Sequence, residues 1–158
     1  MLQVTGARMQ LAHLNRSGLA ADLPRNYDGL MEEEERQGFV DRPLTAVFAT
    51  VDRHGRPHAV PVWYLYRDGV FEVFTDSKSR KASNVRATGR AALCIDEREG
   101  GYRHITAEGP CEIEDSVTKE ARFSLHRRYR SEEAARTIVD RGGHEKMVIL
   151  RLRPERWY

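Results

Sequence analysis

The sequence contains little cysteine and little lysine, and it has no long apolar run. Its two cysteines, Cys94 and Cys111, have no second pair nearby, which excludes the usual zinc-binding spacings and a disulfide framework. We expect both to be small buried apolar side chains. Residues 1–10 lack the apolar core of a signal peptide, and no segment approaches the roughly 20 apolar residues of a membrane helix. The expected protein is soluble and cytoplasmic, with no membrane partner.

The charges of the chain nearly cancel, and the basic ones are mostly arginine. Lysine and arginine together number 26 and aspartate and glutamate 24, so the formal net charge is +2, which argues against a nucleic-acid-binding surface. Only four cations are lysines, and Lys78 and Lys81 lie close together in the chain. Hydrophobic residues make up 40% of the chain, which is enough for only a small core. A small core favours an oligomer, because an oligomer buries further apolar surface between its subunits.

Common nucleotide-binding and metal-binding signatures are also absent. The sequence has no G-x-G-x-x-G, no G-K-[ST] loop and no H-E-x-x-H, and its six histidines do not have the spacing of metal ligands. We therefore expect no metal site. Residues 122–130 are basic and aromatic, but at helical spacing they form one apolar edge and one charged face, which is typical of a surface helix.

The pattern of apolar residues predicts an N-terminal arm at 1–26 and a single domain at 27–158. The domain is expected to contain a helix at 27–40 with Asp28 at its N-cap, a barrel core at 44–114, helices at 115–140 and a last strand at 146–153. Within the core we expect strands at 44–51, 58–67, 70–75, 90–96 and 102–114, with a short helix at 77–88. Six antiparallel strands with one inserted helix predict a mainly β fold, a β-barrel with peripheral helices.

Glycines mark the expected turns of this barrel. Asp68-Gly69 predicts a tight hairpin, so that the first three strands would form an antiparallel meander. Gly89 suits the position just past the end of the inserted helix. Gly109-Pro110 predicts a bulge or a bend in the strand at 102–114.

The segment from Thr75 to Lys81 is a candidate phosphate site, because it runs from the end of a strand into the start of a helix. Free N–H groups at a helix N-terminus favour an anion, and hydroxyls and cations placed there complete the pocket. Arg80 offers two parallel hydrogen bonds to phosphate oxygens, and Lys81 offers a compact positive charge. The alternative is an ordinary first helical turn, capped and solvated.

A second candidate feature is the apolar stretch at 60–66, which Pro61 interrupts. Proline cannot donate to a β-ladder, so this backbone is expected to be bulged or at a sheet edge, with main-chain groups free for a flat, hydrogen-bonding ring. Packing of Trp63, Tyr64 and Tyr66 in the core or an interface explains the same residues equally well.

An ordered set of segments resembles the pyridoxamine 5′-phosphate oxidase-like superfamily, a group of split β-barrel flavin and deazaflavin proteins. The segments are AVFATVDRHGRPHAVPVW at 46–63, FTDSKSRKASNVR at 74–86, AALCID at 91–96 and YRHITAEG at 102–109. The resemblance implies the FMN-binding type of split barrel and a homodimer that holds a flavin-type cofactor between its subunits. The implied phosphate-binding residues are Thr75, Ser79, Arg80, Lys81 and Asn84. The residues implied to meet the ring edge are His58, Ala59, Val60, Pro61 and Val62.

One departure from the family pattern bears on the cofactor. Pyridoxamine phosphate oxidases carry an Arg, followed by Leu-Lys, in the second strand, whereas the corresponding stretch here has no cation before Arg67. The Val-Pro-Val-Trp pattern at 60–63 is more similar to the branch that uses coenzyme F420. We therefore favour coenzyme F420 over FMN.

The resemblance favours an oxidoreductase that transfers a hydride from this cofactor to a small organic acceptor. No residue is assigned as catalytic, and His58, Tyr64 and Tyr102 are candidates for donating a proton. One alternative is a cofactor-binding or storage protein without turnover. Another is a haem-binding split barrel, with His54, His58 or His104 as axial ligand, and a third is an FMN-dependent pyridoxamine 5′-phosphate oxidase.

Overall fold

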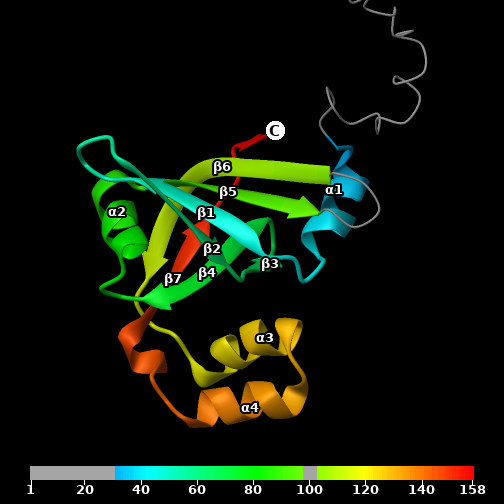
Figure 1. The fold of residues 1–158 in the computed structure, drawn as a ribbon, viewed down its shortest axis with the longest axis vertical. Helices are drawn as coiled ribbons and strands as arrows, with labels where there is room; N and C mark the ends of the chain where they lie inside the picture. Colours follow the sequence, from blue (N-terminus) through cyan, green and yellow to red (C-terminus); the bar gives the residue numbers. More distant parts are fainter. Residues whose placement is uncertain (1–30, 98–102) are drawn as a thin grey trace, which may run out of the picture.

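The computed structural model describes residues 31–97 and 103–158, which form one curled antiparallel sheet with helices around it (Figure 1). The strands are β1 (Ala46–Val51), β2 (Pro57–Val62), β3 (Leu65–Arg67), β4 (Val70–Asp76), β5 (Arg90–Glu97), β6 (Arg103–Glu114), β7 (Met147–Leu152) and β8 (Arg156–Trp157). The helices are α1 (Glu33–Val40), α2 (Arg80–Thr88), α3 (Lys119–Tyr129) and α4 (Glu132–Asp140), with a 3₁₀ turn at His144–Lys146. None of the described helices combines the length and apolar character needed to cross a bilayer.

The strands follow the order β2-β1-β5-β6-β7-β4-β3, and β8 pairs with β6. Strand β6 joins the two halves of this sheet, because its residues up to Pro110 pair with β5 and those from Cys111 pair with β7. Figure 1 shows β6 curving between the two halves. The bend falls at Gly109-Pro110, where the sequence predicts one.

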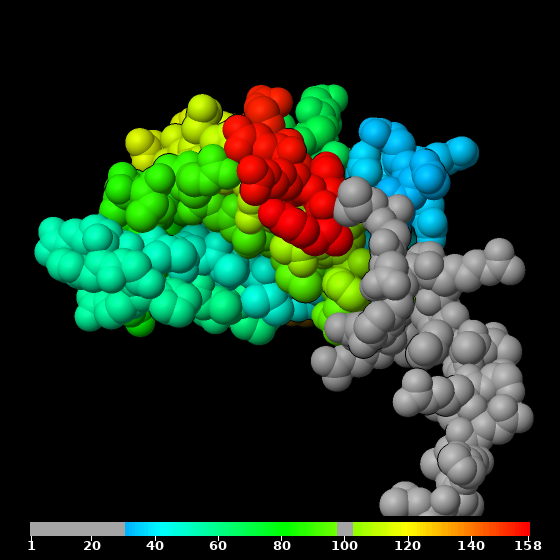
Figure 2. Space-filling model, turned by 90° about the horizontal axis from the view of Figure 1, so that it is seen from above, coloured from blue at the N-terminus to red at the C-terminus, as the bar shows by residue number. Residues whose placement is uncertain are grey.

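The backbone of residues 153–155 crosses β6 at Gly109. The Arg153 and Glu155 amides donate to the carbonyls of Pro110 and Glu108 at 3.0 and 2.9 Å. A Cβ atom at Gly109 would lie 2.0 Å from the Arg153 carbonyl oxygen, so only glycine allows this approach. Figure 2 shows the resulting position of the C-terminal segment, in red, over β5 and β6 and next to α1.

The predicted meander is wrong, and the described residues form a sheet of eight strands rather than six. The expected strand at 58–67 is interrupted at Trp63 and Tyr64, so that β2 pairs with β1 while β3 pairs with β4 at the opposite end of the strand order. Tyr64 leaves the ladder because its side chain is fully buried and its hydroxyl donates to the Val40 carbonyl at 3.0 Å. The additional short strand β8 was not expected from the sequence.

The helices start later than the hydrophobic pattern suggests, and side-chain caps mark where α2, α3 and α4 begin. Helix α1 begins at Glu33, and the expected N-cap Asp28 lies outside the described residues, as does the N-terminal arm. Helix α2 begins at Arg80 because Ser79 is its N-cap, and it ends before Gly89 at φ 65°, as predicted. Thr118 and Ser131 cap α3 and α4 in the same way and divide the expected helical region into two.

The core lies on the concave side of the sheet and is built from alternate residues of the strands. Its largest fully buried side chains are Tyr64, Phe48, Phe71, Leu93, Ile95, Leu150 and Leu152. Cys111 is buried as expected, whereas Cys94 is only half-buried, and both thiols are free. Buried Glu97 forms ion pairs with Arg42 and Arg103, which lower the pKa of its carboxyl to about 2.

We expect Gly109→Ala to destabilise the fold by more than about 2 kcal/mol, because the added methyl group collides with backbone rather than with a flexible side chain. Gly38→Ala is the matched control, since Gly38 lies within α1 with open space around it, and this change should be neutral or stabilising by up to about 1 kcal/mol. Urea unfolding of both variants measures the difference. Equal free energies of unfolding for the two variants would contradict the close crossing at Gly109.

Candidate functional site

The predicted phosphate segment folds as the junction between β4 and α2. Thr75 is 6% exposed near the end of β4, and its hydroxyl donates to the Ser79 hydroxyl at 3.1 Å. The Ser79 oxygen in turn accepts the Ala82 amide at 3.3 Å and caps the helix. The Lys78 amide donates to the Asp76 carboxylate at 2.7 Å. The capped-turn interpretation is therefore correct for the two hydroxyls.

A cap of this kind still leaves donors at the start of α2. The first N–H groups of a helix have no intrahelical acceptor, and Ser79 caps only the amide of Ala82. The amides of Arg80 and Lys81 remain directed out of the N-terminus, where the helix dipole favours a negative charge. Capping and anion binding are thus compatible at this junction.

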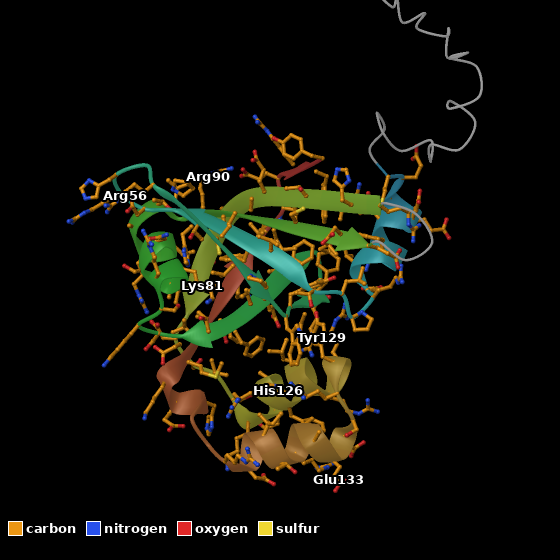
Figure 3. All side chains as sticks on the ribbon, in the orientation of Figure 1. Arg56, Lys81, Arg90, His126, Tyr129 and Glu133 are labelled. Carbon is orange, nitrogen blue, oxygen red and sulfur yellow. The ribbon has the colours of Figure 1, made fainter. Side chains whose placement is uncertain are left out.

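Arg80 does not point toward the same space as Lys81. One face of α2, which carries Arg80 and Asn84, lines a hollow of about 500 Å³ together with the turn between β1 and β2. The remaining residues that line it are Asp52, Arg53, His54, Arg56, Ser83 and Ala87. We refer to this space as the basic hollow. Figure 3 shows Arg56 at the tip of the β1–β2 hairpin, next to α2.

The basic hollow has an excess of positive charge. Its one carboxylate, Asp52, is bound to the Arg56 guanidinium at 2.8 Å, and backbone N–H groups of Arg56 and His54 help to lower its pKa to about 2. Within the described part of the chain, neither Arg53 nor Arg80 forms an ion pair with a carboxylate. The sequence did not lead us to Arg53 and Arg56 as site residues, although two arginines in one short turn could have indicated an anion-binding position.

Lys81 and Asn84 have roles that the sequence did not reveal. Lys81 shares a helix face with buried Val85, and its half-buried position lowers the pKa of its ammonium group because burial disfavours the charged form. Asn84 is buried, and its amide donates to the Thr50 hydroxyl at 2.9 Å, which ties α2 to β1. Thus Asn84 is a structural link that also lines the basic hollow.

Strand β2, which carries all five of the ring-edge residues, is an edge strand of the described sheet, as the proline predicted. His58, Val60 and Val62 are half-buried, while Ala59 and Pro61 alternate with them and are exposed. Beyond Pro61, a smaller hollow of about 240 Å³ is lined by Thr45, Pro61, Val62 and Trp63. The two hollows therefore lie at opposite ends of β2.

Trp63 forms one wall of the smaller hollow and packs against α3. Its ring stacks on Tyr129 at 4.6 Å between centroids, and the Arg130 guanidinium lies 5.0 Å from its centre. His126 meets the same ring edge-on at 6.1 Å, and burial together with Arg122 and Arg130 lowers its imidazole pKa (Figure 3). Packing is thus the observed role of the aromatic residues here.

Of the three candidate proton donors, His58 and Tyr64 belong to the described residues. Tyr64 is fully buried and its pKa is raised by that burial, so its hydroxyl serves the core rather than a reaction. Tyr102 lies outside the described residues. His58 remains, half-buried on β2.

Residues 32–158 match the family model described as pyridoxamine 5′-phosphate oxidase. The pyridoxine/pyridoxamine 5′-phosphate oxidase of Anaplasma phagocytophilum (strain HZ) is 33% identical over an alignment of 121 residues that covers 73% of this chain. The chain spans 58% of the length of that curated relative.

Solved structures share the fold. A conserved hypothetical protein of Mycobacterium tuberculosis matches with a TM-score of 0.67 and 29% identity, over 85% of this chain and 87% of that one. An F420 reductase matches with a TM-score of 0.64 and 22% identity, over 77% of this chain and 94% of that one. A haem storage protein of Vibrio cholerae matches with a TM-score of 0.61 and 17% identity, over 82% of this chain and 94% of that one. These likenesses confirm the split β-barrel that the sequence predicted.

We expect Ser79→Ala to lower the free energy of unfolding by about 1 kcal/mol, because the Ala82 amide loses its cap. Ser79→Asp should restore the stability of the wild type, since aspartate caps helices as well as serine does and its charge suits the helix N-terminus. Thermal unfolding of the three proteins measures this. A destabilised Ser79→Asp variant would show that Ser79 does more than cap the helix in the free protein.

Proposed function

Because this chain belongs to the pyridoxamine 5′-phosphate oxidase family, we propose that it is an oxidoreductase that binds a flavin-type cofactor, coenzyme F420 rather than FMN. The cofactor would serve to reduce a small organic acceptor. The observation that carries this proposal is the pair of hollows at the two ends of β2, one basic and one lined by Pro61, Val62 and Trp63. A flavin-type cofactor has the same asymmetry, with an anionic phosphate at one end and a flat ring at the other.

The residues present fit the phosphate end of such a cofactor. Arg53 and Arg80 face the basic hollow without a carboxylate partner in the described residues, and the free amides at the start of α2 add donors nearby. Arginine forks match phosphate oxygens in pairs, which makes these contacts stronger than neutral hydrogen bonds. Thr75 and Ser79 contribute by holding the helix start in place, and Lys81 adds a positive charge at the same turn.

The chemistry would come from the cofactor rather than from a catalytic constellation of side chains. When bound in its reduced form, it supplies a hydride, so that it is oxidised by two electrons while the acceptor gains the hydride and a proton. The residues of the chain would bind the anionic end of the cofactor, position its ring along β2 and, at Trp63, exclude water from the ring. His58 is our candidate for holding the proton, because it is half-buried on β2.

The preference for coenzyme F420 rests on two features of β2. The strand has no cation, and the nearest ones before and after it are Arg56 and Arg67. The Val-Pro-Val-Trp pattern at 60–63 is similar to the F420-using branch of the superfamily. FMN is the second candidate.

Replacing both Arg80 and Lys81 by alanine should weaken cofactor binding by about 2–4 kcal/mol, that is about 30- to 1,000-fold, because charge-assisted contacts to phosphate are lost. The control is Arg67→Ala combined with Lys119→Ala, which removes the same charge from exposed positions on β3 and α3. Fluorescence titration with coenzyme F420 and with FMN at fixed salt concentration measures the dissociation constants. Equal affinities for the two double variants would contradict the proposed phosphate site.

Turnover separates the enzyme from a storage protein. With saturating reduced cofactor under anaerobic conditions, the proposal expects oxidation of the cofactor when a conjugated enone or another small acceptor is added. Tight binding without oxidation by any acceptor would favour storage. A Soret band after addition of haem would instead favour the haem-binding alternative.

We also propose that the protein is a homodimer joined through the outer face of the sheet. On this face β1 exposes Val47 and Val51 by 39% and 43%. Its register neighbours on β2 and β5 are also small or apolar and comprise Pro57, Ala59, Pro61, Ala92 and Cys94. A further hollow of about 420 Å³ lies on this part of the surface. An apolar face of this extent favours a partner, and a second copy supplies the matching surface.

We expect Val47→Arg to shift the protein toward the monomer, because a buried unpaired guanidinium is costly in an interface. Its folding should be intact, since the side chain is exposed in a single copy. Ser116→Arg, an exposed change away from this face, is the control. Sedimentation velocity over a range of concentrations distinguishes the two states. A dimer of unchanged strength in Val47→Arg would exclude this face as the interface.

A further inference from the structure

The turn between β1 and β2 carries three side chains that line the basic hollow, those of Arg53, His54 and Arg56. The Asp52 amide donates to the Arg56 carbonyl at 3.1 Å and closes this turn. All three side chains are exposed. A long side chain on an exposed turn samples many rotamers unless a contact orients it, and ordering it on binding lowers the affinity for a ligand. The contacts within the turn therefore bear on how well the hollow binds an anion.

The Asp52 carboxylate organises the backbone of the turn. Its Oδ1 accepts the amide of His54 at 2.8 Å and the amide of Arg56 at 3.0 Å. Its Oδ2 accepts from the Arg56 Nε at 2.8 Å. Aspartate stabilises tight turns in this way, by accepting from amides a few residues further along the chain. The carboxylate is thus engaged within the turn, and it fixes the backbone that carries His54.

The His54 imidazole in turn orients Arg53. The Arg53 Nε donates to the His54 Nε2 at 3.1 Å. A guanidinium group stays protonated, so its Nε is always a donor and the ring nitrogen must be the acceptor. His54 is therefore neutral in this contact, with its proton on Nδ1. The terminal nitrogens of Arg53 form no hydrogen bond within the described residues, which leaves their N–H groups for a ligand.

We propose that His54 is a positioning residue, which holds the Arg53 guanidinium in the orientation that binds the anionic end of the cofactor. This inference rests on the proposed function. A guanidinium group held at its Nε presents its remaining N–H groups as a planar fork, which matches two oxygens of a phosphate or a carboxylate. Because the group is ordered before the anion arrives, less entropy is lost on binding.

A neutral partner suits this role better than a charged one. Asp52 holds Arg56 by an ion pair, which compensates part of the positive charge of that guanidinium. A second carboxylate beside Arg53 would likewise repel an incoming anion. The neutral imidazole of His54 fixes the side chain and leaves its positive charge intact. Thus Arg53 offers an anion both a fixed geometry and a full charge.

Replacement of His54 tests this role at about pH 8, where histidine is ordinarily neutral and its loss changes no charge. His54→Leu removes the acceptor. It should raise the dissociation constant for coenzyme F420, or for FMN if only FMN binds, about 3- to 10-fold, which is the effect of one more side chain to be ordered on binding. His54→Gln is the matched control, because its side-chain oxygen accepts as the ring nitrogen does, and it should bind as the wild type does. Fluorescence titration at fixed salt concentration measures the constants.

An Arg53→Ala background separates positioning from a general effect on the turn. Arg53→Ala alone should weaken binding, and His54→Leu should then have no further effect, because no guanidinium group is left to position. Equal losses from His54→Leu in the two backgrounds would overturn the inference. Wild-type affinity in either single variant, or a His54→Gln variant as weak as His54→Leu, would also overturn it, while cofactor binding itself stands.

Long-range ¹H–¹⁵N spectra of the free wild-type protein give a second measurement, which needs no variant. At about pH 8 the His54 ring should carry its proton on Nδ1, with Nε2 as the unprotonated acceptor. A His54 ring protonated on Nε2 would overturn the inference and leave the proposed function untouched. Failure of the wild type to bind either coenzyme F420 or FMN would overturn both the inference and the proposed function.

Discussion

The arrangement of this fold depends on the Tyr129 hydroxyl, which closes the break between β2 and β3. It accepts the Tyr64 amide at 3.2 Å and lies 3.1 Å from the carbonyls of Tyr64 and Leu44. One phenol thereby satisfies main-chain groups that leave the ladder where the chain passes from one half of the sheet to the other. The stacking of the same ring on Trp63 holds α3 against this crossing.

The consequences of that break extend to the candidate site. Because the chain leaves the sheet after Val62, β2 is an edge strand, and no other strand of residues 31–97 and 103–158 pairs with its outer side. Arg128, the neighbour of Tyr129, donates to the carbonyls of Val40 and Arg42 and fixes the segment between α1 and β1. Side chains of α3, far along the chain, therefore hold the backbone that leads to the smaller hollow.

Local signals in the sequence were sufficient for the features that one turn or one helix end decides. Asp68-Gly69, Ser79 and Gly89 adopt the turn, cap and stop that their chemistry favours. The interruption at Trp63 could not be predicted in this way, because the hydroxyl that permits it comes from 65 residues away. The basic hollow could not be predicted either, because Arg53 and Arg80 come to line the same space only when the β1–β2 hairpin packs beside α2.

The position of β7 has a consequence for the order in which the fold can assemble. β7 lies between β6 and β4 in the sheet, yet in the chain it follows every core strand that it joins. While the protein is being synthesised, the β3–β4 hairpin emerges from the ribosome long before the strand that connects it to the other half. Its edge can pair with β7 only after residues 147–152 have been made, so completing this half of the sheet requires a contact between distant parts of the chain, a kind of contact that generally slows folding.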